Sequence, residues 1–258
     1  MSVMSRHHGK SSVKIYQITD THLAETADES DANLEKLLDI VNQDTEDNVL
    51  LLTGDLVNAA VPSAYNRIKL YLERRENISH CYALAGNHDD RECMKACFKN
   101  SKIKLTHSAT VHSIPFHFVD TSHKPLGASL DLGAGRVSHK ELAVLKKAVR
   151  KSPSLIVSHH PILDVSDKWF KKIGIENQAQ IVRCFKSKRT IISGHAHHYF
   201  DIKAGNIHQL VGISSSYGFK HESEIPQRTR IVGMTIYDAN WSNGDLTVSH
   251  VDNFCLHN

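Results

Sequence analysis

Short apolar runs alternate with amphipathic stretches along the first part of the chain. Apolar runs at residues 13–19, 48–53 and 81–85 predict buried strands. Leu34, Leu37 and Leu38 recur at helical spacing and predict a helix over residues 30–43. Pro62 fits the first turn of another helix, and a short helix is expected at residues 91–98. Strands that alternate with helices are typical of an α/β fold.

The same alternation continues through the middle of the chain and then gives way to strands. Residues 109–120 predict one strand whose alternation is interrupted by Pro115. Helices are expected at 138–151 and 177–185, and strands at 155–157 and 190–193. After residue 198 the pattern is strand-rich, with expected strands at 207–213, 231–237 and 246–251. No repeat or linker interrupts it, so we expect a single domain over residues 13–258 after a disordered tail at residues 1–12.

Polar residues gather where five of these apolar runs end. In chain order they are Asp20 and His22, Asp55, Asn87 and His88, His159, and His195 and His197. Sites of α/β proteins are built at such strand ends, so we expect these residues to converge in one core. On an extended backbone, Asp-x-His and His-x-His direct both side chains to the same side, so each pair is expected to address one ion.

The chemistry of this set indicates metal binding. Carboxylate, imidazole and amide oxygen without sulfur suit zinc, manganese or iron rather than copper(I) or an iron–sulfur cluster. Seven ligands are too many for one ion but suit two ions that share a carboxylate. Taken singly, Asp-x-His or Gly-Asp is more often a turn or a helix cap, and His159 or His160 alone would be a hydrogen-bonded core histidine. Five such motifs at five strand ends favour a site.

Composition and charge exclude several classes of function. The 258 residues are 40% hydrophobic and 23% charged, and a net charge of +3 is too mild to predict a nucleic-acid or membrane surface. The five cysteines form no CxxC pair, which argues against a disulfide framework or a thiolate zinc site. Residues 1–12 lack the apolar core of a signal peptide, and no apolar run approaches the length of a spanning helix. We expect a soluble, cytoplasmic protein.

The ordered set resembles the calcineurin-like metallophosphoesterases. The matching motifs are Asp20-x-His22, Gly54-Asp55, Gly86-Asn87-His88-Asp89, His159-His160-Pro161 and Gly194-His195-Ala196-His197. The openings QITDTHL and TGDL, the SAY that follows, and Gly135-Arg136-Val137-Ser138 look more specifically like the bacterial class III cyclic-nucleotide phosphodiesterases. The resemblance covers about residues 13–215. It implies a four-layer αββα sandwich with a binuclear metal site at the strand ends.

The resemblance also implies a role for each residue. It assigns Asp20, His22 and His197 to one ion, assigns Asn87, His159 and His195 to the other, and makes Asp55 the bridge. His159 is preferred to His160 because the family ligand lies two positions before the proline. His88, next to Asn87, would contact the substrate and act in catalysis without binding an ion. Two departures from the family pattern are Ala59-Ala60 and the loosely matching segment from Gly212 to Gly218.

The implied activity is hydrolysis of a phosphodiester, most specifically 3′,5′-cyclic AMP to 5′-AMP. Two iron, manganese or zinc ions roughly 3.5–4 Å apart would bind the phosphate and lower the pKa of a bridging water towards ~7. His88 would protonate the leaving alkoxide. The alternatives are another ester, such as a glycerophosphodiester, a nucleotide-sugar lipid or a phosphomonoester, or a non-catalytic scaffold, which the intact ligand set disfavours. The expected partner is a small phosphoester, bound by a monomer or a homodimer.

Overall fold

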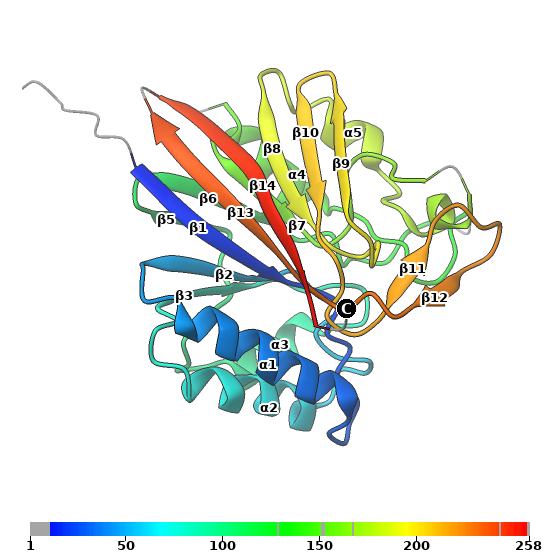
Figure 1. Cartoon of the computed structure of the whole chain (residues 1–258). Helices are drawn as coiled ribbons and strands as arrows, with labels where there is room; N and C mark the ends of the chain where they lie inside the picture. The colour runs from blue at the N-terminus through cyan, green and yellow to red at the C-terminus, as the bar shows by residue number, and fades with distance from the viewer. Residues whose placement is uncertain (1–10, 128, 151–152, 167, 243, 257–258) are drawn as a thin grey trace, which may run out of the picture.

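The computed structural model describes residues 11–127, 129–150, 153–166, 168–242 and 244–256. Two six-stranded sheets pack face to face (Figure 1). The first sheet has the order β14-β13-β1-β2-β3-β4, formed by Asp245–Cys255, Gly233–Ser242, Ser11–Ile18, Asn48–Leu52, His80–Ala83 and Ile103–Lys104. The second has the order β5-β6-β7-β8-β10-β9, formed by Ser108–Val111, Ile114–Val119, Leu155–Ser158, Arg189–Ser193, Ile207–Val211 and Phe200–Ala204. A two-stranded ribbon joins β11 (Gly218–Lys220) to β12 (Gln227–Thr229).

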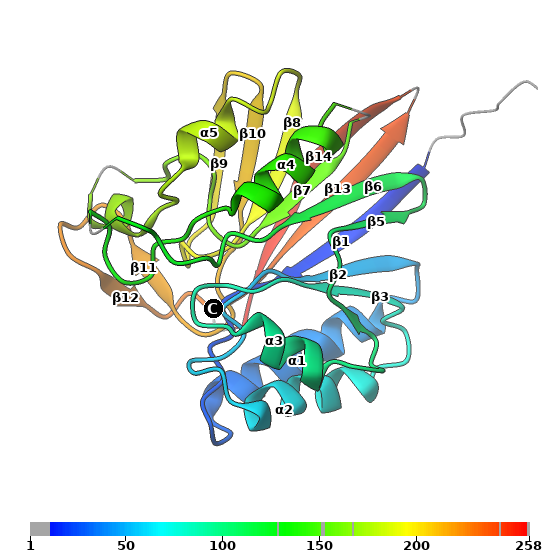
Figure 2. The ribbon, with the colours of Figure 1, turned by 180° about the vertical axis from the view of Figure 1, so that it is seen from behind.

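Helices cover the outer face of each sheet. The helices α1 (Glu29–Gln43), α2 (Pro62–Glu73) and α3 (Arg91–Cys97) lie on the first sheet, whereas α4 (His139–Ala148) and α5 (Gln178–Val182) lie on the second (Figures 1 and 2). A short 3₁₀ helix, η1 (Trp169–Ile173), precedes α5. The layers therefore run helix, sheet, sheet, helix, which confirms the four-layer αββα architecture that the resemblance implied. No helix within the described residues is long and apolar enough to cross a membrane.

Three buried clusters fill the spaces between these layers, and strand periodicity explains them. In β2, Val49 and Leu51 pack against the second sheet, while Leu50 and Leu52 pack under the helices of the first. Successive side chains of a strand point to opposite faces, so a strand covered on both sides is apolar throughout. The third cluster, which includes Ile156 and Ile191, lies between the second sheet and its helices. The run at residues 48–53 was therefore correctly interpreted as a buried strand.

Parallel pairing brings the predicted motifs to one end of the sandwich. Strands β1, β2 and β3 run parallel in the first sheet, and β7 and β8 run parallel in the second. Parallel strands place their carboxyl ends on the same edge of a sheet. The loops that follow these five strands carry the five predicted motifs, and contacts between the loops of the two sheets close this end of the molecule.

The secondary structure departs from the sequence prediction in three places. The single strand predicted over 109–120 is a hairpin, β5 and β6, because the chain turns at His112 and Ser113, and Pro115 pairs with Thr110 within it. The short strands β4, β9, β11 and β12 were not predicted. Strand β1 begins at Ser11, two residues before the predicted start, and the rest of the predicted tail lies outside the described residues.

Candidate metal centre

The backbone at the predicted ligands adopts an unusual conformation. Asp20, His22, Asp55, His195 and His197 have φ angles of 53°, 45°, 49°, 68° and 51°, in the left-handed region. Residues other than glycine rarely occupy this region, and such strain gathers at functional sites. The prediction that Asp-x-His and His-x-His lie on an extended backbone is therefore wrong. Each motif turns tightly at the end of its strand.

The first group of predicted ligands lies where β1 and β8 end. Ligand atoms of Asp20, His22 and His197 all lie within 4.8 Å of one another, and all three residues are buried. The two Nε2 atoms of His22 and His197 are 3.2 Å apart, and Asp20 Oδ1 lies 3.3 Å from His197 Nε2. Because Nδ1 of His197 donates to the Tyr217 carbonyl at 2.6 Å, Nε2 of the neutral ring is an acceptor.

The second group lies where β3 and β7 end. His159 Nδ1 donates to the Thr53 carbonyl at 2.8 Å, which leaves Nε2 as the acceptor of the neutral ring. This Nε2 lies 3.2 Å from Asn87 Oδ1 and 3.4 Å from Asp55 Oδ2. With this ring neutral, three acceptor atoms thus face one another. A cation satisfies such an arrangement, and the nitrogen and oxygen ligands suit zinc, manganese or iron.

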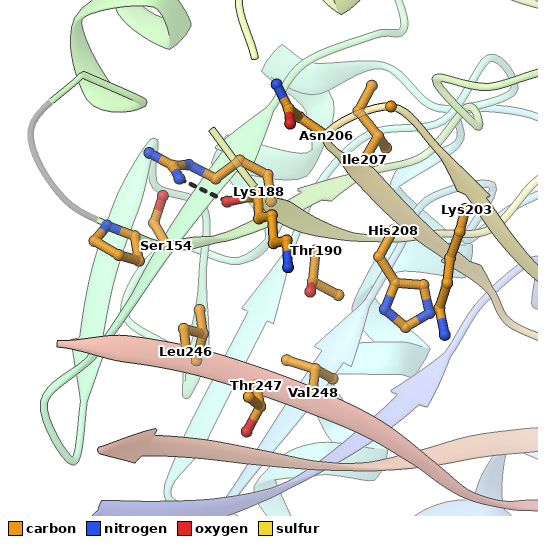
Figure 3. Close-up of a pocket in the computed structure, with 13 residues that line it drawn as sticks. Ser154, Lys188, Thr190, Lys203, Asn206, Ile207, His208, Leu246, Thr247 and Val248 are labelled. Carbon is orange, nitrogen blue, oxygen red and sulfur yellow. Dashed lines mark hydrogen bonds between the residues drawn. The ribbon is translucent and has the colours of Figure 1, made fainter. Parts of the chain in front are cut away.

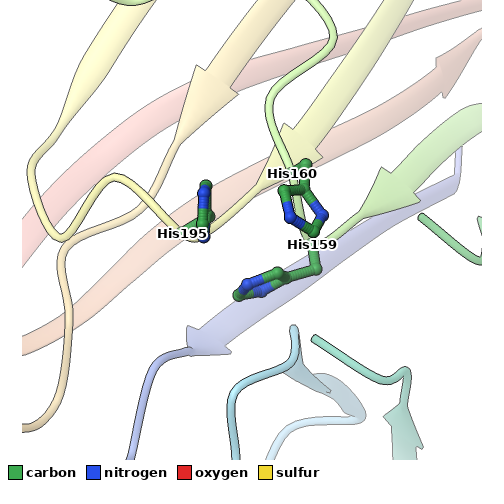
Figure 4. A group of neighbouring side chains, drawn as sticks. All are labelled: His159, His160 and His195. Atoms are coloured by element: carbon green, nitrogen blue, oxygen red, sulfur yellow. The ribbon is translucent and has the colours of Figure 1, made fainter. Parts of the chain in front are cut away.

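His195 joins the second group rather than the first (Figure 4). Its ring lies 4.9 Å from that of His159, and its Nε2 donates to the Ile173 carbonyl at 2.9 Å, so Nδ1 is the acceptor. The residue-based expectation that His195 and His197 address one ion is therefore wrong. The division that the resemblance implied, with one histidine in each group, matches this geometry.

His160 belongs to the same cluster of rings but has no nitrogen to spare. Its Nδ1 contacts Thr121 Oγ1 at 2.8 Å, and its Nε2 contacts the Gly133 carbonyl at 2.9 Å. Burial and the neighbouring His159 lower the pKa of His160 to about 3. A neutral ring with two hydrogen-bond partners supports the loop and is a poor ligand. The geometry thus agrees with the choice of His159 over His160.

Asp55 connects the two groups. Its Oδ2 lies 3.8 Å from His22 Nε2 in the first group and 3.4 Å from His159 Nε2 in the second. Its Oδ1 accepts a hydrogen bond from the His88 amide at 2.9 Å, which fixes the carboxylate plane. One oxygen therefore faces both groups, as a bridging ligand must.

An orphaned carboxylate oxygen in the first group also fits a cation. Asp20 Oδ2 accepts bonds from Thr19 Oγ1 and the His195 amide, but the buried Oδ1 has no hydrogen-bond partner. Buried carboxylate oxygens without partners are costly unless they pair or coordinate a metal. The residues present therefore fit a pair of metal ions.

The electrostatics of the two groups favour added positive charge. Although burial alone would lower it, the Asp55 carboxylate raises the pKa of His159 to about 9. Burial and His197 lower the pKa of His22 to about 4. Despite burial, the neighbouring imidazole of His197 holds the pKa of Asp20 below its usual range. Both predicted carboxylate ligands are thus ionised, and the space between the groups stabilises a cation.

Two glycines allow the loops to approach this closely. A Cβ at Gly86 would lie 2.1 Å from Asp55 Oδ1, and one at Gly194 would lie 2.0 Å from Thr19 Oγ1. Any side chain at either position would displace the carboxylate or its supporting hydroxyl.

His88 stands at the solvent side of the centre. Its side chain is exposed, its ring meets that of His22 edge-on at 4.9 Å, and its Nδ1 donates to the Asn58 carbonyl at 3.0 Å. This bond leaves Nε2 as the free nitrogen. Ligand atoms of His22, Asp55 and His88 also lie within 4.8 Å of one another. A role for His88 beside the ions thus stays a prediction, tested below.

Sequence reasoning missed the segment that closes the first group. The hydroxyls of Ser214 and Ser216 donate to the Asp20 carbonyl at 3.0 and 2.6 Å. The Tyr217 ring stacks on His22 at 5.4 Å, and the Arg228 guanidinium lies 3.9 Å from the centre of the Tyr217 ring. These residues occupy the loosely matching segment and β12, and only the run of three serines beside a tyrosine hinted at them.

Comparison with known proteins agrees with this geometry. Residues 13–199 match the calcineurin-like phosphoesterase family model. A 3′,5′-cyclic-nucleotide phosphodiesterase from Nostoc sp. is 27% identical over 226 residues, covering 82% of this chain and 81% of that protein. The 3′,5′-cyclic adenosine monophosphate phosphodiesterase CpdA from Vibrio vulnificus is 24% identical over 229 residues, covering 83% and 81%.

Solved structures share the fold at low sequence identity. The phosphopantetheinyl hydrolase PptH from Mycobacterium tuberculosis superposes with a TM-score of 0.53 at 14% identity, covering 81% of this chain and 90% of that chain. A 5′-nucleotidase precursor from Thermus thermophilus has a TM-score of 0.53 at 12% identity, covering 95% of this chain and 54% of that one. At these identities the likeness concerns the fold alone.

Proposed function

We propose that this chain, which belongs to the calcineurin-like phosphoesterase family, hydrolyses 3′,5′-cyclic AMP to 5′-AMP at a pair of metal ions. Phosphoric ester hydrolysis follows from the family, and named relatives act on cyclic nucleotides. The metal pair and the nucleotide are the parts that we infer.

One observation carries the metal pair: the carboxylate of Asp55 lies between two clusters of acceptor atoms. Its Oδ2 is 3.8 Å from His22 Nε2 on one side and 3.4 Å from His159 Nε2 on the other. Two like clusters that share one carboxylate suit two cations better than one. Asp20, His22 and His197 would hold the first ion, and Asn87, His159 and His195 the second.

When bound, two ions supply positive charge for the phosphate oxygens and a water of lowered pKa as the nucleophile. Asp55 would hold both ions through its carboxylate. His88 lies at the open side with its Nδ1 engaged, so its Nε2 can carry a proton to the leaving alkoxide of the substrate. Asn87 is adjacent and orients the same phosphate.

Arg228 adds positive charge at the rim of the centre. Arg228 lies over the ring of Tyr217, and Tyr217 lies 4.5 Å from the ring of His197. The Arg228 guanidinium would attract an anionic substrate and contact either its phosphate or its base. We infer that the β11–β12 ribbon, which carries Arg228, contributes to the choice of substrate.

The test is turnover by the metal-loaded protein on a panel of esters. We expect hydrolysis of 3′,5′-cyclic AMP with 5′-AMP as the product, separated chromatographically from 3′-AMP, and slower hydrolysis of bis-p-nitrophenyl phosphate. Glycerophosphocholine and p-nitrophenyl phosphate are the competing diester and monoester. A clear preference for either would overturn the cyclic-nucleotide assignment.

Two histidine variants test whether turnover depends on the candidate metal centre. His197→Ala should abolish turnover and lower the number of bound ions. His139→Ala is the matched control, because His139 is exposed at the start of α4. Full turnover by the His197 variant would refute a metal mechanism at this centre, whatever the substrate.

A further inference from the structure

A separate cluster of potential metal ligands lies at the other end of the strands. Asp47 precedes β2, His80 opens β3, and His112 lies in the turn between β5 and β6. Their ligand atoms all lie within 4.8 Å of one another. These residues stand at the amino ends of parallel strands, whereas the candidate metal centre follows the carboxyl ends. The two groups therefore share no residue and occupy opposite ends of the sandwich.

The Asp47 carboxylate lies between two imidazole nitrogens. Its Oδ2 is 2.6 Å from His112 Nε2, and its Oδ1 is 3.3 Å from His80 Nε2. Ser79 Oγ donates to Oδ1 at 3.1 Å and fixes the orientation of the carboxylate. The three side chains are 30–46% exposed, so an ion can enter directly from solvent.

The turn that carries His112 is strained. His112 and Ser113 have φ angles of 46° and 66° in a two-residue hairpin turn. Hairpin turns with two positive φ angles normally take Asn-Gly, and neither His nor Ser is favoured there. Strain of this kind persists where surrounding contacts hold it. The contact of His112 with Asp47 is such a contact, and it joins the second sheet to the first.

We propose that Asp47, His80 and His112 bind one divalent transition-metal ion, with solvent completing the coordination. Two imidazoles and one carboxylate are the ligand set that zinc takes when one position stays open. Asp47 precedes β2 and His80 opens β3 in the first sheet, whereas His112 belongs to the hairpin of the second. The ion would therefore tie the two sheets together at this end, and it would stabilise only the folded chain.

The test counts zinc ions in variants of the full chain. After dialysis against dilute Zn²⁺, His112→Ala and Asp47→Asn should each hold one ion fewer per chain than the wild type, by elemental analysis. His139→Ala should hold the wild-type number. Because the result is the difference in bound zinc between each variant and the wild type, it does not depend on how many ions the candidate metal centre holds. Equal counts in all four proteins would overturn the proposal.

A second measurement guards against an indirect effect of the variants. Zn²⁺ added to the wild type should shift the imidazole ¹⁵N resonances of His80 and His112, and these shifts should vanish in Asp47→Asn. Turnover by His112→Ala should equal that of the wild type if the proposed function is right. Zinc-dependent shifts that persist without the Asp47 carboxylate would exclude the three-ligand site.

A cavity of about 460 Å³ lies between the two sheets, apart from the Asp47 cluster. It opens where β8, β9 and β10 face β14 (Figure 3). On the second sheet, Ile192 and Leu210 belong to the core between the sheets. Two residues earlier in these strands, the same face carries Thr190 on β8 and His208 on β10, which are paired in the sheet. Lys203 on β9 is paired with His208 on the other side. The inner face of the second sheet thus changes from apolar to polar at this end, whereas Leu246 and Val248 keep the facing side of β14 apolar.

The lining combines an apolar wall with cations. Leu246 and Val248 form the wall on β14, and Lys188 and Lys203 reach towards it from the other side (Figure 3). Together with Arg189 these lysines give three basic lining residues, and none of the described lining residues is acidic. Ser154, 1% exposed, also lines the cavity and its Oγ has no hydrogen-bond partner. Buried hydroxyls without partners are uncommon, so Ser154 has an unused hydrogen bond to offer a ligand.

From this lining we infer that the cavity binds a small organic anion whose apolar body rests on Leu246 and Val248 and whose anionic group lies between Lys188 and Lys203. The volume falls within the range of small-molecule sites. Ser154 and Thr190 would supply hydroxyl groups to the anion. The cavity lies at the end of the sandwich away from the candidate metal centre, so its ligand is not the substrate of that centre.

The test uses phenylphosphonate, which no hydrolase of this type can cleave, and methyl-labelled protein. Saturable shifts are expected at the methyl resonances of Leu246 and Val248, which separates this cavity from the candidate metal centre. The double variant Lys188→Gln/Lys203→Gln should weaken binding at least tenfold, whereas Lys147→Gln, on the exposed face of α4, should not. Neutral benzyl alcohol should not saturate. Absence of shifts at about 10 mM, or equal affinity in the double variant, would overturn the inference.

Discussion

Gln17 hydrogen-bonds the first sheet to the second beneath the candidate metal centre, and Gln17→Leu should destabilise the protein strongly. The side chain is fully buried in β1. Its Nε2 donates to Thr53 Oγ1 and to the Ser193 carbonyl, each at 2.8 Å, and its Oε1 accepts from the Tyr237 hydroxyl at 2.8 Å. Leucine has a similar size but can make none of these bonds.

The expected loss in unfolding free energy follows from the groups that the substitution leaves without a hydrogen bond. The Ser193 carbonyl keeps a bond from the Gly212 amide, so it is not orphaned. The hydroxyls of Thr53 and Tyr237 lose their partner in a region with no access to water. Each buried, unsatisfied group costs about 1–3 kcal/mol, and added apolar burial offsets about 1 kcal/mol. The net loss should be about 3 kcal/mol, which lowers Tm by about 6–12 °C in a chain of this size.

Urea unfolding in the presence of a chelator measures this loss without a contribution from bound ions. Tyr237→Phe should cost about 1–3 kcal/mol alone, because it orphans Gln17 Oε1. In the Gln17→Leu background the same change should be neutral or stabilising, since it removes an orphaned hydroxyl. The double-mutant cycle of Gln17→Leu and Tyr237→Phe should therefore show a coupling free energy of about 1–3 kcal/mol. A Gln17→Leu loss below about 1 kcal/mol, or strict additivity, would refute the reasoning.

Four further outcomes are expected. Asp55→Ala should abolish turnover and tight binding of the ion pair, because one carboxylate oxygen faces both ligand groups; two ions per chain by elemental analysis would contradict this. Chelation of the loaded protein should lower Tm, since ions present at a hundredfold excess over Kd add about 2.7 kcal/mol to the folded state; an unchanged melt after verified metal removal would argue against the centre. His88→Ala should keep both ions and lose about a hundred- to a thousandfold in turnover, with a smaller loss on p-nitrophenyl esters if His88 protonates the leaving group; a missing ion would make His88 a ligand. Asp120, although buried, has a pKa held below its usual range by bonds from Ser122 and by Arg91, so it stabilises the fold at neutral pH and this contribution is lost as the pH falls. Asp120→Asn should therefore cost about 1–3 kcal/mol at pH 7, and this cost should shrink as the pH falls below the ordinary carboxyl pKa. Urea melts that give the same difference in unfolding free energy at every pH would contradict the assignment.

Local periodicity decided most of the secondary structure, because a residue's face on a strand or helix depends only on its neighbours in sequence. Helix α1 was predicted within one residue of its observed start, and the apolar run at residues 48–53 was correctly interpreted as a buried strand. The hairpin at His112 was missed because its turn lacks the glycine or asparagine that normally marks two positive φ angles. Strand β9 was missed because it is short and largely exposed.

The sequence also identified the residues at the strand ends, since polar residues that follow five buried runs are improbable by chance. Only the tertiary structure decided how they group. His195 and His197 are two residues apart, yet each joins a different cluster, because left-handed backbone angles at both turn their rings apart. No local pattern encodes that geometry. The contribution of Tyr217 and Arg228 likewise depends on the β11–β12 ribbon lying against the loop after β8, where the Phe219 amide donates to the His197 carbonyl. Such a long-range contact is not encoded in any local stretch of sequence.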